Sequence, residues 1–538
     1  MNVDLRIAGV TKMAAWCGAA ALAWGLTATT WGLDVRTVAL SGYAAPGTGG
    51  LLFSGFGAPI MADFDAVAFV GLVDDGDLDG FWSEGILGAG ALDLVAVQGD
   101  NTPDLSTTFG SFGGTNIYLN FIGVAAFVNP LANNTTGFFG QVGAGDTLDK
   151  IVVGGDSAPG TTDPARVFQN DFGNVGGFNT FTDTAFRGFM PPTAGPGNFP
   201  SSGVFAGAPT LIDKVAEVGD AAPGTVSNFS QFRTPALSNT RHVAFVGNIG
   251  GGTSEGVWQR LDGGSLTRIA GAGDAAPGGG TFSILFGDTV AINDTGDVAF
   301  TSQLTGGTIP DGVYVSRNGG IDKVALEGDA APGAGGAFFR TTGTGIETSF
   351  LALDADGNAF FTANLSDNRR GLFGERNGVL EAIAIGKFSS GNPGTTAPGT
   401  GGDTFQNVLR WAINDGGQVA FLGSLTTSNR NALFATDLGG NLVYIVGEGD
   451  FLEVAPGDLR EIEFLNFYGF DGSIGSSGNN VSRGINNDGL IAFQASFLDG
   501  TQGVFVTNIP EPGTALAMVA LALFASRSRR SRRLTAAA

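Results

Sequence analysis

The chain of 538 residues contains one cysteine and one histidine, and each shortage excludes a class of chemistry. Cys17 lies in an apolar N-terminal segment, so the rest of the chain can form no disulfide and offers no thiol nucleophile. His242 has no second histidine to join it, so neither a Ser-His-Asp triad nor a histidine-rich metal site can be assembled. We therefore expect a protein that is not an enzyme and that has no cofactor.

Basic residues are also few, with 27 Lys and Arg against 50 Asp and Glu and a formal net charge of −23. A body of this sign repels phosphate backbones, which excludes nucleic-acid binding. Its acidity suits an exported soluble protein, or one that meets cations or cationic polymers. Hydrophobic residues make up 43% of the chain at regular spacing, which favours a large buried core over disorder.

The chain does contain eight complete or altered copies of one motif, N-x-x-G-x-x-A-F. The clearest copies carry their asparagine and glycine at Asn120 and Gly123, Asn293 and Gly296, Asn414 and Gly417, and Asn486 and Gly489. The terminal phenylalanines of the eight copies are Phe69, Phe127, Phe186, Phe245, Phe300, Phe361, Phe421 and Phe493. Most of them are about sixty residues apart, and such a period is the mark of a repeat architecture.

Each repeat holds four short apolar pieces rich in Val, Ile and Phe and bounded by Gly, Asn, Asp or Pro, with no helical period. A Gly-apolar-aromatic slot follows each motif, and most repeats then have a Gly-Asp pair before Ala-Pro-Gly. Four strands repeated eight times predict an all-β fold, an eight-bladed β-propeller. A β-solenoid or two smaller propellers are the alternatives.

The two ends of the repeat region complement each other. Val38–Gly42 reads as a third strand without the two strands that should precede it, and the last unit stops at its second strand, Gly503–Val506. We therefore expect the N-terminal strand to complete the last blade and to remove the open sheet edges.

The repeated polar residues have a structural and a functional interpretation. The structural one is that Asn and Asp cap tight turns by accepting a backbone N–H two residues on, with Gly in the left-handed position. The functional one is that carboxylates gather on one face of the ring and bind Ca²⁺ or a cationic sugar. The repeated carboxylates are Asp100, Asp156, Asp220, Asp274, Asp329 and Asp450. Because an active site is normally singular, repetition favours the structural interpretation.

One loop resembles the first half of a calcium loop. Asp75, Asp77 and Asp79 follow the D-x-D-x-D-G pattern, but Ile86 occupies the twelfth position, where a bidentate acid is expected, and Glu84 lies two places early. Calcium binding through these three residues is therefore kept only as an alternative to the absence of any metal.

Both ends of the chain carry targeting features. Residues 1–33 are typical of a secretory signal peptide, with Arg6 and Lys12 before the apolar run 13–28, and an uncleaved membrane anchor is the alternative. At the other end, Pro510, Glu511, Pro512 and Gly513 precede an apolar run, 515–525, and a basic stop made of Arg527, Arg529, Arg530, Arg532 and Arg533. Eleven apolar residues reach only ~16 Å as a helix, short of a stable span, so this segment suits a transient hold in the membrane.

Residues 509–538 resemble the PEP-CTERM sorting signal of Gram-negative bacteria that make extracellular polysaccharide. The resemblance implies an exosortase that recognises the Pro-Glu-Pro motif, cuts near it, and releases or re-anchors the protein at the cell surface. The repeats resemble the choice-of-anchor tandem-repeat family named for N-x-x-G-x-x-A-F, for which the resemblance implies no activity.

Together these features predict a signal peptide (1–33), a repeat propeller (34–508) and a sorting signal (509–538). We expect an exported, non-enzymatic protein of the cell surface or exopolysaccharide matrix, with an exosortase and the membrane as transient partners and extracellular polysaccharide as a further candidate. A carbohydrate-binding module and a glycoside hydrolase or lyase are the alternatives. The least repetitive segments, 450–482 and 190–202, are expected to be loops that form specific surfaces.

Overall fold

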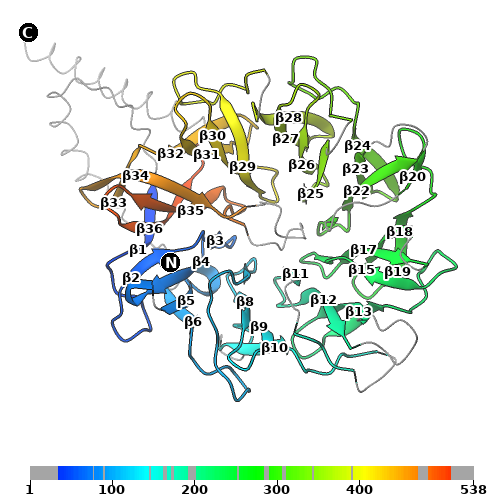
Figure 1. Ribbon diagram of the computed structural model, residues 1–538, viewed down its shortest axis with the longest axis horizontal. Coiled ribbons are helices and arrows are strands. Elements are labelled where there is room, and N and C mark those ends of the chain that lie inside the picture. Colours follow the sequence, from blue (N-terminus) through cyan, green and yellow to red (C-terminus); the bar gives the residue numbers. More distant parts are fainter. Residues whose placement is uncertain are drawn as a thin grey trace, which may run out of the picture. The chain divides into compact units, whose positions relative to one another are not determined.

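The computed structural model describes residues 34–510, except 77, 89–90, 144–146, 162–165, 171–174, 192–200, 251–253, 284–289, 306–310, 342–344, 389–391 and 470–482. Within these residues the only helical elements are two 3-10 turns, η1 (Asp74–Gly76) and η2 (Ile86–Gly88). The described strands form eight antiparallel sheets arranged in a ring (Figure 1). The predicted eight-bladed β-propeller is therefore confirmed.

Blades 1 to 8 follow one another along the chain, and each runs from an inner strand through a second and a third to an outer strand. Blade 1 contains β2 (Phe53–Phe56), β3 (Ile60–Met61), β4 (Val67–Val73), β5 (Leu78–Ser83) and β6 (Asp93–Val97); blade 2 contains β7 (Ile117–Leu119), β8 (Ala125–Pro130), β9 (Thr136–Gly140) and β10 (Asp149–Val153). Blade 3 contains β11 (Val175–Phe178), β12 (Thr184–Met190), β13 (Ser201–Gly207) and β14 (Asp213–Glu217); blade 4 contains β15 (Phe229–Phe232), β16 (Ala236–Leu237), β17 (Val243–Ile249), β18 (Ser254–Arg260) and β19 (Leu266–Gly271).

Blade 5 contains β20 (Thr281–Phe282), β21 (Val290–Ile292), β22 (Val298–Thr305), β23 (Asp311–Arg317) and β24 (Gly320–Leu326); blade 6 contains β25 (Ile346–Leu353), β26 (Ala359–Asn364), β27 (Arg370–Arg376) and β28 (Val379–Gly386). Blade 7 contains β29 (Phe405–Ile413), β30 (Val419–Leu425), β31 (Asn431–Thr436) and β32 (Leu442–Gly447). Blade 8 contains β33 (Phe451–Ala455), β34 (Asp458–Phe467), β35 (Leu490–Phe497), β36 (Gln502–Asn508) and β1 (Val35–Leu40).

Blade 8 closes the ring as the sequence predicted. Strand β1 pairs antiparallel with β36, with Val35 opposite Thr507 and Leu40 opposite Gly503. Figure 1 shows these two strands, from opposite ends of the propeller, side by side. The closure therefore needs both ends of the repeat region, because no other described segment supplies the outer strand of blade 8.

The segment expected as a loop over 450–482 is in part a hairpin. Strands β33 and β34 pair with Phe451 opposite Glu461, and the second half of β34 pairs with β35 as the inner strand of blade 8. The expectation was wrong for 451–467, where alternate residues of β33 are buried, as in other strands. The other segment, 190–202, contains the end of β12 and the start of β13, with 192–200 outside the described residues.

The core of each blade is built on a cross-strand aromatic pair. The motif phenylalanine on the second strand lies opposite the aromatic residue of the third strand, as in Phe127 and Phe139, whose ring centroids are 5.8 Å apart. The glycine of the Gly-apolar-aromatic slot makes room for this ring, since a Cβ at Gly137 would lie 2.5 Å from the Phe139 ring. The repeated aromatic residues of both strands are therefore buried in the core.

The Gly-Asp pairs cap the outer strands, although in a different way from the one expected. Asp156 accepts the backbone N–H of Val153, three residues before it, at 2.9 Å, rather than an N–H two residues on. Its other oxygen accepts from Lys150 Nζ at 2.9 Å. The same arrangement recurs at Asp220 and Asp274, and at Asp329 the equivalent two donors both bond to Oδ2. A basic residue six positions earlier, on the outer strand, is thus the second partner of the carboxylate.

The turn between inner and second strands should be sensitive to its glycine. Gly296 has φ +88°, and a Cβ there would lie 2.9 Å from Leu261 Cδ2. Gly296→Val should therefore lower the free energy of unfolding by about 1–3 kcal/mol, because a β-branched residue is strained in the left-handed region. Thermal unfolding measures the effect, with Gly416→Val as the control, since Gly416 lies in the same turn of blade 7 without a left-handed φ. Equal losses in the two variants would contradict this assignment.

Candidate functional site: the turn ring

The eight turns that join inner to second strands, here called the turn ring, hold most of the residues singled out by the motif. In blade 2, Asn120 Oδ1 accepts the N–H of Ile122 at 3.2 Å and that of Val124 at 2.8 Å. Gly123 has φ +94°. The interpretation of Asn as a turn cap with a left-handed glycine is confirmed. Where the glycine is replaced, the substitute keeps a positive φ, as in Asp65, Thr182 and Arg241.

The amide nitrogen of the same asparagine makes a bond that the sequence did not predict. Asn120 Nδ2 donates to the carbonyl of Asn179, the corresponding residue of the next blade, at 3.0 Å. The equivalent donors and acceptors around the ring are Asn179 to Ser238, Asn293 to Asp354 and Asn414 to Asn486. Asn486 Nδ2 donates to Asp65 Oδ1 of blade 1 at 3.0 Å, across the point where the ring closes. One side chain therefore both shapes its own turn and links it to the next blade.

Blade 6 carries an aspartate where most blades have this asparagine. In blade 5 Asn293 Nδ2 also donates to Asp297 Oδ2 at 3.1 Å, whereas in blade 6 Asn358 Nδ2 donates to Asp354 Oδ2 at 2.8 Å. The donor and acceptor have exchanged places within the turn. Burial raises the pKa of Asp354 to about 6, against the effect of the hydrogen bonds from Asn358. No donor from Asp354 reaches the next blade, because an ionised carboxylate has none.

Charged residues of the turn ring meet at the closure between blades 7, 8 and 1. Arg483, which precedes the motif of blade 8, pairs with Asp415 at 3.0 Å and with Asp63 at 3.2 Å. Burial raises the pKa of Asp63 although Arg483 opposes the shift, and Asp415 adds to it. Burial also raises the pKa of Asp294, again with a contribution from Asp415. Arg483 thus forms ion pairs that connect blade 8 to blades 7 and 1.

A second group of acids lies between blades 5 and 6, away from the turn ring. Burial raises the pKa of Glu327 to about 7, although the backbone hydrogen bond from Asp311 opposes the shift more strongly than the charge of Asp311 adds to it. Glu327 Oε1 accepts the N–H of Gly345, just before inner strand β25, at 3.0 Å. This acid therefore also joins one blade to the next.

His242 lies in the altered turn of blade 4. The imidazole Nδ1 of His242 accepts the backbone N–H of Asp262 at 3.0 Å, and the backbone N–H of His242 donates to Ser238 Oγ at 3.1 Å. Burial lowers the pKa of His242. The imidazole thus joins two turns of one blade in its neutral form.

The calcium alternative is only partly covered by the described residues. Asp77 lies outside them, as does the side chain of Asp75. The carboxylate of Asp79 is buried and accepts from the N–H groups of Phe112 and Gly113, each at 2.8 Å, and from Ser111 Oγ at 2.5 Å. Among the described residues no group of three His, Cys, Asp or Glu side chains is placed to hold a metal ion.

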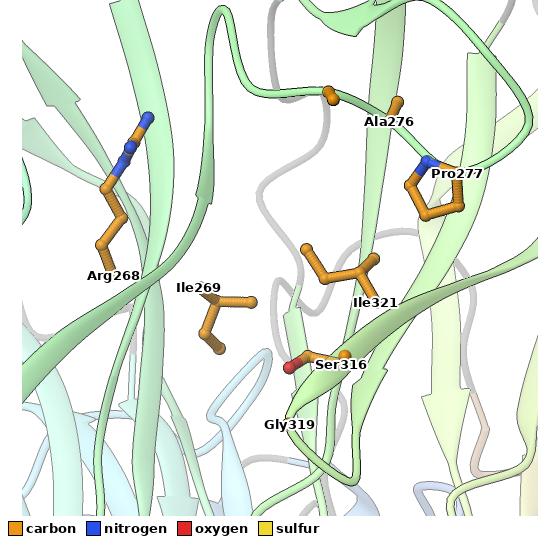
Figure 2. A pocket seen from close by; sticks show the side chains of 9 residues that line it. Arg268, Ile269, Ala276, Pro277, Ser316, Gly319 and Ile321 are labelled. Atoms are coloured by element: carbon orange, nitrogen blue, oxygen red, sulfur yellow. The ribbon is translucent and has the colours of Figure 1, made fainter.

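A pocket of about 610 Å³ lies between the outer parts of blades 4 and 5. Figure 2 shows Arg268 on one side of it and Ser316 and Ile321 on the other, with Ile269 between them. Arg268 is paired with Asp274 at 3.2 Å, and the remaining lining is Gly, Ala, Pro and Ile apart from Ser316. The pocket offers no group of side chains suited to catalysis.

The segment expected to be a sorting motif begins directly beyond the last strand. Ile509 donates its N–H to the carbonyl of Gly489 at 3.0 Å and is buried. Pro510 is the last described residue, so Glu511, Pro512, Gly513, the apolar run 515–525, the five arginines and the expected signal peptide lie outside the described residues. In the part of the chain that the structure describes, no helix is long and apolar enough to cross a membrane.

The fold and the turn ring define a closed eight-bladed propeller whose motif residues connect its blades. The chain belongs to a family of unknown function, DUF7453, whose model matches residues 19–143, 129–384 and 311–516. No curated protein sequence matches it.

Some solved structures are similar to this chain at low identity and low TM-score. A Mycobacterium tuberculosis puromycin-hydrolysing peptidase is 12% identical over 86% of this chain and 61% of its own, with a TM-score of 0.36. The Trypanosoma rangeli sialidase is 11% identical over 68% and 59%, with a TM-score of 0.30. The six-bladed fucose-binding lectin of Aleuria aurantia is 10% identical over 60% and 87%, with a TM-score of 0.24. The chain thus spans less than two thirds of the peptidase and the sialidase, and none of these likenesses bears on function.

The exchanged pair in blade 6 leads to a pH-dependent prediction. Asp354→Asn should stabilise the protein at neutral pH by about 1–2 kcal/mol, because it removes a buried charge and supplies an Nδ2 donor. The folded-state pKa of about 6 lies above the ordinary value of 3.8, so wild-type stability falls as pH rises through this window. The gain should therefore be largest above pH 6 and shrink below about pH 4.

Urea unfolding at several pH values measures this gain. The matched control is Asn293→Asp, the reverse change at the same position of blade 5, which should destabilise most at neutral pH because it buries a charge and removes the bond to blade 6. A pH-independent gain from Asp354→Asn would contradict a buried charge at residue 354. No loss from Asn293→Asp would show that the turn asparagine does not link the blades.

Proposed function

We propose that this chain is an exported, non-enzymatic protein of the cell surface or exopolysaccharide matrix, sorted and processed at its C-terminus by an exosortase. The observation that carries the proposal is where the propeller ends. Strand β36 ends at Asn508, Ile509 is still bonded to blade 8, and the Pro-Glu-Pro sequence starts at Pro510. Cleavage within or after that motif leaves every described strand in place, so the tail serves to target a fold that is complete without it.

The use of the polar repeat residues supports a structural role. The turn asparagines, the Gly-Asp carboxylates and His242 each bond to neighbouring turns, strands or blades. These bonds make a rigid disc without needing any ligand. Such a disc, carried to the outer surface by the tail, suits an adhesive or matrix-forming protein of a Gram-negative bacterium.

The intact mass of the protein recovered from the outer surface of its native host tests the sorting. Loss of both ends, near residues 28–32 and 510–514, is expected because the signal peptide and the tail are processed outside the folded body. A mass that retains Arg527 to Arg533 would instead make the tail an ordinary anchor and remove the basis for the proposal.

A second candidate, carbohydrate binding, is favoured by the β33–β34 hairpin. This hairpin is the part of blade 8 that departs most from the repeats, and it exposes Phe451, Leu459 and Phe464 by 64%, 61% and 48%. Exposed aromatic rings on a rigid strand pair provide an apolar contact surface for the faces of sugar rings.

Polysaccharide isolated from the host tests this candidate. Phe451→Ser combined with Phe464→Ser should reduce retention of the protein on that polymer by at least about tenfold, which corresponds to ~1.4 kcal/mol. Leu211→Ser, at an equally exposed apolar residue in a turn of blade 3, is the control and should bind as the wild type does. Equal binding by all three proteins would exclude the hairpin as the sugar-binding surface.

A further inference from the structure

Both ends of the propeller leave it at the same place. Val35 lies opposite Thr507, and Leu490, which follows the turn of blade 8, lies opposite Asn508. In blades 1 to 7 this place is taken by the turn between third and outer strands, as at 260–266 in blade 4. Blade 8 has the two chain ends there instead, one leading back to the signal peptide and the other on to the sorting signal.

These ends belong to one face of the ring, here called the turn face. It consists of the turn ring and the turns between third and outer strands, which lie on the same side because successive strands are antiparallel. The two sets of turns touch, since a Cβ at Gly123 of the turn ring would lie 2.5 Å from the carbonyl oxygen of Gly85. The opposite side, here called the loop face, holds the connections between blades and between second and third strands.

The length of chain beyond the propeller limits how far this face can be from the membrane. The apolar run begins at Ala515, only five residue steps beyond Pro510. Fully extended, they reach about 17 Å. The loop face lies farther from the apolar run than the turn face does, by the length of β36, which is seven residues or about 24 Å at ~3.4 Å per residue. The closure edge of the turn face is therefore the part of the disc nearest to any bilayer that holds the run.

The turn face also exposes apolar side chains from several blades. The most exposed members are Phe64, Leu87, Phe181, Leu211, Leu261 and Leu438. They come from blades 1, 3, 4 and 7, so they are spread around the ring rather than gathered beside the tether. The same face also exposes the carboxylates of Asp262 and Asp322, which gain nothing from an anionic surface.

From the position of the chain ends and these side chains, we propose that the turn face lies on the bilayer surface while the C-terminal segment is held in the membrane, with the loop face pointing away. The proposal rests on the membrane-held precursor of the proposed function. Scattered apolar residues in an acidic surface bind a bilayer weakly, so the contact depends on the high effective concentration that the tether supplies. Cleavage near Pro510 removes the tether and frees the disc.

The absence of cysteine from the propeller provides a clean test, since Cys17→Ser leaves the full chain without a thiol. Two exposed residues are changed to cysteine, one at a time: Leu438 on the turn face, which is 68% exposed, and Val226 on the loop face, which is 107% exposed. Each full-length variant is labelled with a fluorophore and added to phosphatidylcholine vesicles containing a minor share of phosphatidylglycerol and a quencher on the lipid headgroup. The label at residue 438 should lose most of its emission and the label at residue 226 should keep it.

A matched control breaks both apolar runs of the full chain, with Leu521→Asp and Leu523→Asp in the C-terminal run and Leu22→Asp and Leu26→Asp in the N-terminal run, after which neither label should be quenched. Quenching of both labels alike, or of residue 226 alone, would overturn the orientation while leaving the membrane-held precursor intact. Failure of the unaltered tail to bring the protein to vesicles at all would overturn both the orientation and the proposed function.

Discussion

The bond from the side-chain amide of one turn asparagine to the backbone of the next turn is the interaction on which the ring depends. Its oxygen holds the local turn through the N–H groups two and four residues on, and its nitrogen donates to the equivalent position one blade further. Because both the oxygen and the nitrogen of this buried amide are hydrogen-bonded, the side chain adds stability without leaving an unpaired polar group. Glycine or another residue with positive φ then turns the chain back so that the Ala-Phe pair enters the second strand.

Neighbouring blades are hydrogen-bonded to each other in different ways on the two sides of the ring. At the turn ring the same asparagine is repeated in five blades, and Ala62, Ser238 and Asp354 occupy the equivalent position in the other three. On the other side four contacts between blades use different polar residues: Asp79 binds the N–H of Phe112, Arg187 the carbonyl of Phe232, Glu327 the N–H of Gly345 and Arg370 the carbonyl of Val408. Hydrogen bonds that differ from one blade contact to the next help to keep the blades in order, because two blades in the wrong order would leave buried polar groups unpaired.

Closure concentrates the charges that the repeats otherwise keep apart. Arg483 comes from the segment before the last motif and binds carboxylates of blades 7 and 1, while Asn486 donates to Asp65 of blade 1. Strand β1 completes blade 8 from the other end of the chain. The last blade is therefore held by residues from three blades, and it is also the blade from which both chain ends leave.

The sequence by itself determined the all-β class, the number of blades, the strand that closes the ring and the local role of Asn120 and Gly123, because each depends on a period, a strand pattern or turn chemistry within a few residues. Only the tertiary structure decided what Asn120 Nδ2 binds, since Asn179 is 59 residues away in the chain. It also decided that Asp156 faces back to Val153 and Lys150, that 451–467 forms a hairpin, and that Arg483 meets Asp63 and Asp415. The physical reason is that a repeat predicts its own strands and turns from local sequence, whereas its partners depend on how the ring brings distant turns together.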